Sequence, residues 1–185
     1  DQLGLAVVIE TGARYLLDPW RKHHPTLVSD GDREPRIDLL RRAIDIGGEL
    51  GAEAVSFWSG TLPPARDRDI GWDRLCTGVD PLLGYAQDHG VVLAFEPEPG
   101  MLVATLDDVI ELRHRLGDPQ ILRITLDLGH IVCNEPRDVG ATIAAAGPLL
   151  ANVQVDDMVR DVHEHLQIGH GTMDFPAALA ALNEI

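Results

Sequence analysis

Short apolar runs alternate along the chain with longer segments in which apolar residues recur at helical spacing. Five short segments predict strands, at about residues 3–9, 54–58, 91–95, 121–126 and 152–155, and the first of them is a continuous apolar run, as expected for a strand that is buried on both faces. The other segments predict helices over about residues 35–50, 80–88, 105–116, 138–146 and 175–185. This repetition of strand, loop and helix predicts a parallel sheet of right-handed βαβ units, which places the chain in the α/β class.

Proline, glycine and capping side chains mark the ends of these predicted helices. Pro35 stands near the first turn of the first helix, and Gly51 follows its last residue. Asp80 is expected to cap the second helix, with Pro81 at its first position. Thr105 is expected to cap the third, which has an acidic first turn. No glycine-rich phosphate motif follows the first strand, so the pattern argues against a nucleotide-binding fold.

Composition and charge narrow the class of protein further. The chain has 185 residues, enough for one domain, and its 45% hydrophobic and 24% charged residues are typical of a soluble protein. No apolar stretch approaches the roughly 20 residues that span a bilayer, and no signal peptide is visible, so we expect a cytoplasmic protein without a membrane partner. Cys76 and Cys133 make no disulfide framework, as expected in a reducing compartment. The net charge of −15 argues against a nucleic-acid partner.

Oxygen-bearing side chains stand at or near the ends of three successive predicted strands. Glu96 follows the third strand, Asp127 follows the fourth, and Gln154 lies near the end of the fifth. In barrels and open α/β sheets, functional residues gather at the carboxyl edge of the strands. Structural interpretations exist as well: Glu96 as a solvated loop acid, and Asp127 as a cap for the turn before His130. The recurrence at three strand ends favours a shared site.

Three histidines add to this pattern. His163 and His165 are two residues apart, so they cannot share one face of a helix but can converge from an extended segment. His130 stands three residues after Asp127. Neutral imidazole is a good ligand for Zn, Mn, Fe or Co, and we therefore expect a metal centre. The alternative is that His163 and His165 hydrogen-bond the acidic loop at residues 156–161 and orient Arg160.

The order of these motifs resembles the xylose-isomerase-like (β/α)8 barrels, which include sugar-phosphate isomerases and epimerases and the endonuclease IV type of apurinic endonuclease. In that superfamily, metal-binding or catalytic side chains end the fifth, sixth and seventh strands. The matching residues here are Glu96, Asp127 with His130, and Gln154 with Asp156 and Asp157. Two further motifs of the superfamily have counterparts here. Ketose epimerases have an arginine six residues after the seventh-strand histidine, and Arg160 stands six residues after Gln154. The endonucleases have a metal-binding motif before a glycine-flanked turn, and its counterparts are His163 and His165 before Gly169-His170-Gly171.

The resemblance implies a single TIM-barrel domain over residues 1–185, in which the chain supplies about five β/α units that correspond to barrel strands 3 to 7. Because the chain opens with Asp1 rather than Met, we expect a longer polypeptide to supply the remaining strands; a partner chain is the alternative. Two departures weaken the match. Gln154 stands where the superfamily has a histidine ligand, and residues 57–60 lack the histidine of the endonuclease metal site.

The function implied by the resemblance is a metal-dependent sugar or sugar-phosphate isomerase or epimerase that transfers a proton beside a carbonyl. The implied catalytic residues are Glu96, His130 and Arg160. The implied ligands of a divalent ion, Mn, Zn, Co or Mg, are Glu96, Asp127, Gln154, His130, His163 and His165. The expected partner is a small sugar or sugar phosphate, and a homo-oligomer is compatible with this interpretation. Two alternatives stay open: an endonuclease IV-like phosphodiester hydrolase and a non-catalytic metal- or sugar-binding barrel.

Overall fold

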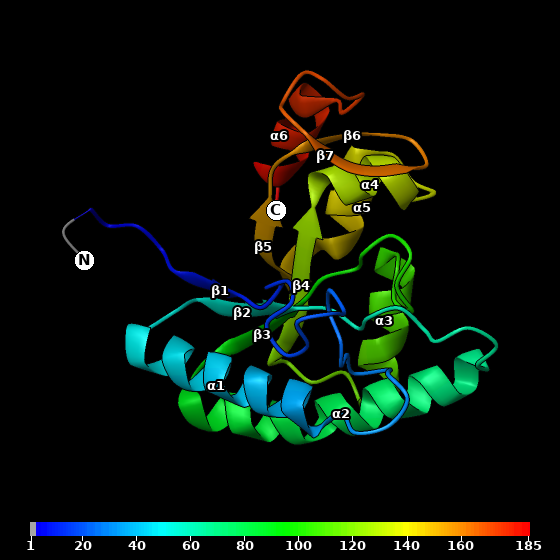
Figure 1. The fold of residues 1–185 in the computed structure, drawn as a ribbon. Coiled ribbons are helices and arrows are strands. Elements are labelled where there is room, and N and C mark those ends of the chain that lie inside the picture. The colour runs from blue at the N-terminus through cyan, green and yellow to red at the C-terminus, as the bar shows by residue number, and fades with distance from the viewer. Residues whose placement is uncertain (1–2) are drawn as a thin grey trace.

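Five parallel strands form one sheet in the computed structural model, which describes residues 3–185 (Figure 1). The strands lie side by side in sequence order: β1 (Val8–Glu10), β2 (Ala54–Phe57), β3 (Val92–Phe95), β4 (Leu122–Asp127) and β5 (Leu150–Gln154). The sheet curls so strongly that Asn152 Nδ2 on β5 donates a 3.2 Å hydrogen bond to Glu10 Oε1 on β1, although three strands lie between them. The predicted parallel α/β fold is confirmed, as a partial barrel.

Helices connect the strands and cover the sheet. They are α1 (Glu34–Leu50), α2 (Arg68–His89), α3 (Leu106–Arg115), α4 (Leu128–Asn134), α5 (Val139–Ala146) and α6 (Phe175–Leu182), with a short 3-10 helix at Gly147–Leu149. In Figure 1, α1 and α2 run side by side along one face of the sheet, while α5 packs against α6 near the end of the chain. The predicted helices that became α1, α3, α5 and α6 are confirmed within a few residues.

The predicted start of the second helix at Asp80 is wrong. The helix α2 begins at Arg68, is capped by the Asp67 side chain, and carries Pro81 in its interior. An interior proline costs a helix roughly 3 kcal/mol, whereas each large apolar side chain that is buried contributes about 1.5–3 kcal/mol. The part of α2 before the proline buries three such side chains, those of Trp72, Leu75 and Val79. Burial therefore outweighs the proline, and the helix continues through it.

Two elements were absent from the sequence prediction. The helix α4 starts directly after β4, and a hairpin of β6 (Asp157–Val159) and β7 (Val162–Leu166) packs over α4 (Figure 1). Asp161 adopts a left-handed conformation with φ 62° in the hairpin turn, which aspartate tolerates better than most residues. The first strand is also shorter than predicted, since residues 3–7 are exposed and only Val8–Glu10 pairs with β2.

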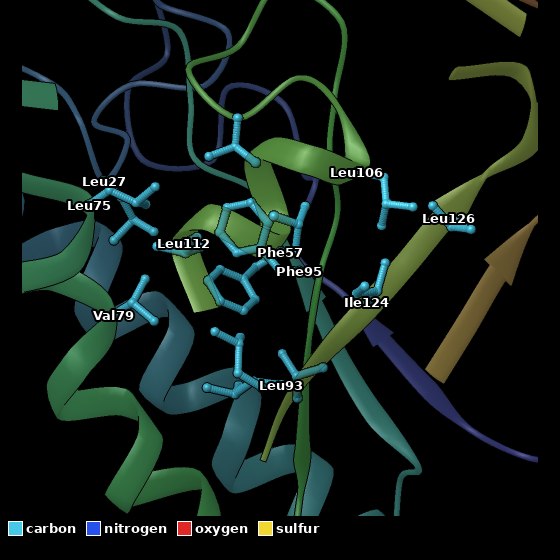
Figure 2. Close-up of a cluster of buried hydrophobic side chains, with 14 of the residues drawn as sticks. Leu27, Phe57, Leu75, Val79, Leu93, Phe95, Leu106, Leu112, Ile124 and Leu126 are labelled. Atoms are coloured by element: carbon cyan, nitrogen blue, oxygen red, sulfur yellow. The ribbon is translucent and has the colours of Figure 1, made fainter. Parts of the chain in front are cut away.

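The main hydrophobic core lies between the sheet and helices α1 to α3. Figure 2 shows Phe57 and Phe95 at its centre, with Leu93 and Ile124 on the sheet and Leu112 on α3. The two phenylalanine rings meet edge to face, with centroids 4.9 Å apart, and both side chains are buried. Because these residues end β2 and β3, their packing fixes the carboxyl edge of the sheet, where the chain next places Trp58 and Glu96.

Within residues 3–185, none of the helices has both the length and the apolar content that crossing a membrane would require.

Candidate metal centre

A buried group of two carboxylates and one imidazole lies at the carboxyl edge of the sheet. Glu96 extends β3, because its backbone N–H donates to Phe57 O at 2.8 Å. Asp127 ends β4 and caps α4 by accepting a 3.0 Å hydrogen bond from His130 N. The exposed fractions of Glu96, Asp127 and His130 are 6%, 3% and 5%, and one ligand atom from each lies within 4.8 Å of the others. This spacing suits a shared cation.

The hydrogen bonds of His130 determine which of its ring nitrogens can bind an ion. Nδ1 lies 3.2 Å from Pro97 O and 3.5 Å from Glu96 Oε1. Because a carbonyl can only accept, Nδ1 carries the proton of this bond. Burial and the two neighbouring histidines lower the pKa of His130 to about 4, so the ring is neutral near pH 7. Its Nε2 is buried and has no hydrogen-bond partner within residues 3–185, which leaves a lone pair free for a metal.

The second group consists of three imidazoles. His163 and His165 are two residues apart on β7, so both side chains project from the same face of the hairpin. The centroid of the His130 ring lies 5.0 Å from that of His163 and 5.6 Å from that of His165, and the two hairpin rings are 5.5 Å apart. One nitrogen from each ring lies within 4.8 Å of the others. The free Nε2 of His130 and this convergence fit the donor set of a zinc-type site.

Asp156, which the resemblance matched to the end of the seventh barrel strand but which was not among the expected metal ligands, forms a third group with Asp127 and His165. Its carboxylate accepts a hydrogen bond from Gly129 N at 3.1 Å and pairs with His165 Nδ1. A Cβ on Gly129 would stand 2.1 Å from Asp156 Oδ1, so only glycine permits this approach. The available signal was spacing: Asp156 stands two residues after Gln154, on the same side of an extended chain.

Gln154 lies on the cavity that these groups border, whereas Arg160 lies apart from it. Gln154 lines the same cavity as the histidines and Glu10. Arg160 lines a separate hollow beside α4 and α6, where its Nη1 donates to Val132 O at 3.4 Å and to the backbone oxygen of Glu135. Its Nε lies 3.8 Å from the exposed carboxylate of Asp161. The position of Arg160 therefore gives no support to the prediction that it holds the substrate.

A cavity of about 690 Å³ opens over the site. Its walls come from the strand ends, the loop that follows β1, and β7. Burial, together with the negative charges of Glu98 and Asp127, raises the pKa of Glu96 to about 9, and burial raises that of Glu98 to about 7. Burial also raises the pKa of Asp127 and Asp156. Crowded carboxyl groups of this kind are strongly stabilised by a divalent cation.

Comparisons with known proteins agree with this architecture. The uncharacterized protein MJ1311 of Methanocaldococcus jannaschii is 25% identical over 173 residues, which cover 90% of this chain and 59% of that protein. An inosose dehydratase of Salmonella typhimurium is 37% identical over 67 residues, which cover 36% of this chain and 22% of the enzyme. The chain thus spans only part of the length of its curated relatives.

Solved structures and a family model extend the comparison to the whole fold. A D-tagatose 3-epimerase-like protein matches with a TM-score of 0.83 at 22% identity, over 100% of this chain and 68% of that protein. The model of the family described as the xylose isomerase-like TIM barrel matches residues 2–185. The resemblance expected from the strand-end motifs is therefore confirmed, and the chain belongs to the xylose isomerase-like TIM barrel family.

Proposed function

We propose that this chain carries the active site of a divalent-metal-dependent sugar isomerase or epimerase, which moves a proton on the carbon beside a carbonyl. The observation that carries the proposal is the buried group of Glu96, Asp127 and His130, which adjoins a cavity of about 690 Å³. A cavity of this size accommodates a monosaccharide. Similarity to an inosose dehydratase and to a D-tagatose 3-epimerase-like protein supports a sugar as substrate.

The ion would be held by Glu96, Asp127 and His130, with His163 and His165 as the donors of the adjacent group and Gln154 as a further candidate ligand. A donor set that mixes imidazole and carboxylate favours Zn, Mn or Co over Mg. A divalent ion bound here would polarise a carbonyl and its neighbouring hydroxyl, which acidifies the C–H bond between them.

Two carboxyl groups are placed to handle the proton. Glu96 follows β3 directly, and Glu98 lies two residues further along on the wall of the same cavity. The backbone of Glu98 is fixed in a turn, since its N–H donates to Val103 O at 3.2 Å and its carbonyl accepts from Met101 N at 3.0 Å. We propose that these carboxyl groups share the roles of acid and base and that His130 orients the ion or a sugar hydroxyl.

Solvent hydrogen exchange tests this proposal on a panel of sugars, so the substrate need not be identified first. Ketohexoses and ketopentoses, together with their phosphates and the corresponding sugar acids, are incubated with the intact protein in D2O, and proton NMR follows loss of the signal beside the carbonyl. We expect exchange that stops on chelation and falls at least about 100-fold in Glu96→Gln, as is typical for loss of an acid–base group. Arg160→Ala is the control and should exchange normally. A metal-loaded protein that exchanges no sugar in the panel would overturn the proposal.

A phosphodiester hydrolase of the endonuclease type is the second candidate, because the imidazoles of His130, His163 and His165 converge as candidate metal ligands beside the carboxylate group. The net charge of −15 opposes it, since DNA is a polyanion. Cleavage of an oligonucleotide with one abasic site, lost on substitution of His165 by alanine, would favour this function over the isomerase.

A further inference from the structure

We propose that Arg14 and Lys22, on the loop after β1, bind an acidic group of the substrate. The inference rests on the proposed function for the idea that the substrate is a sugar, and it adds that this sugar carries a phosphate or a carboxylate. Both side chains line the cavity that also holds Glu96 and His130. They therefore face the space that the substrate would occupy.

Neither cation forms a close ion pair with a carboxylate among residues 3–185. Within that part of the chain, the side chains of Arg14 and Lys22 form no ion pair or hydrogen bond. Most other arginines on the surface are paired, for example Arg21 with Asp18 at 2.7 Å and Arg137 with Asp107 at 2.8 Å. In a chain of net charge −15, two unpaired cations on one cavity wall are unusual and leave their donors available for a ligand.

A backbone hydrogen bond closes the loop next to the two cations. Tyr15 N donates a 2.7 Å hydrogen bond to Lys22 O, which closes residues 15–22 into a loop. Arg14 directly precedes this bond, and Lys22 forms its other side. Although the two residues are eight positions apart in the sequence, this hydrogen bond brings their backbones close together beside the cavity that both residues line.

A buried arginine fixes the returning arm of the loop. Arg36, only 3% exposed, donates from Nε to Pro25 O at 2.9 Å and from Nη2 to His23 O at 2.9 Å. Its guanidinium also stacks over Trp58 at 4.8 Å, and the His23 ring meets Trp58 edge to face at 4.9 Å. Lys22, which precedes His23, is thereby attached to a fixed wall rather than to a free loop. Such preorganisation strengthens binding, since little ordering is needed when a ligand arrives.

The fields of the two cations overlap inside the cavity. Arg14 and Lys22 both act to lower the pKa of Glu98, although burial raises it overall, and they add to the effect of burial in lowering the pKa of His23. A guanidinium presents a planar pair of donors and an ammonium a compact charge, and together they suit a phosphate or a carboxylate. A role limited to balancing the charge of Glu98 predicts no affinity for external anions, so binding experiments separate the two roles.

The test is titration calorimetry of the intact protein with inorganic phosphate and, in a second arm, with acetate, at pH 8. We expect phosphate, acetate or both to bind the wild type, and the probe that binds more tightly identifies the acidic group. The double variant Arg14→Gln/Lys22→Gln should weaken that binding about tenfold or more, as expected for loss of charge-assisted hydrogen bonds. Arg21→Gln on the same loop is the matched control, and Lys22→Arg should retain affinity.

Both substituted side chains are exposed, so the variants should fold, and a thermal melt verifies this. Absence of binding of both probes to the wild type, or equal affinity in the double variant and the Arg21→Gln control, would overturn the proposal. Exchange on neutral sugars together with such a result would remove the anion site and leave the isomerase. Anion binding that depends on Arg14 and Lys22, without exchange on any sugar, would keep the anion site and overturn the isomerase.

Discussion

Replacing Glu96 by glutamine separates the cost of burying this carboxyl group from its benefit as a metal ligand. Without metal, its pKa of about 9 means that the folded chain keeps the proton at pH 8, whereas the unfolded chain has lost it. A group whose pKa is raised by folding destabilises the fold increasingly as pH rises from its ordinary value toward its folded value. Between pH 5 and pH 8 this amounts to about 4 kcal/mol, at 1.36 kcal/mol for each pH unit.

Glutamine has the same shape and no proton to lose, so the Glu96→Gln variant should escape this cost. Urea denaturation of metal-free protein at pH 5 and pH 8 should show the variant gaining up to about 4 kcal/mol over the wild type across this interval. Saturating Mn or Zn should stabilise the wild type more than the variant and narrow or reverse the difference. If the stability difference between the two proteins does not change from pH 5 to pH 8, the argument from burial is refuted.

Three further predictions concern the hairpin and the core. His165→Ala should lower the amount of bound zinc, measured by plasma mass spectrometry. His170→Ala is the control, because His170 is in no candidate metal group within residues 3–185, and it should not lower the zinc content. Equal zinc content in the two variants would remove His165 from the site. Leu93→Ala should lower the free energy of unfolding by about 2–5 kcal/mol in urea, and a smaller loss would show that the buried site collapses. Gly171→Ala would place a Cβ 2.3 Å from Asp157 Oδ1, so its melting temperature should fall, and an unchanged one would show that the hairpin adapts.

The parallel sheet was predictable because each inner strand is buried on both faces. Such a strand appears in the sequence as an unbroken apolar run, as in β3, where the successive residues Leu93, Ala94 and Phe95 are all buried. Glu96 and Asp127 were then found by their position alone, since the carboxyl ends of parallel strands meet at one edge. Both inferences depend on a pattern that is local in sequence.

Features that depend on contacts distant in sequence were not predictable. The start of α2 depends on burial that outweighs Pro81, and no local pattern reports that balance. The position of Arg160 is fixed by backbone carbonyls of α4 and the residue after it, about 25 positions earlier. Arg14 and Lys22 belong to a polar loop without a recognisable pattern, because the bond between Tyr15 N and Lys22 O leaves no trace in the sequence.

His130 is a member of both the carboxylate group and the three-imidazole group, and a neutral imidazole has a single lone pair to offer. While Nδ1 donates to Pro97 O, that lone pair is on Nε2, so the ring can serve one ion at a time. The two groups therefore compete for one ligand instead of filling independently. Occupancy of one should weaken the other, and a second ion would have to draw Nδ1 away from the Pro97 carbonyl or be held without this ring.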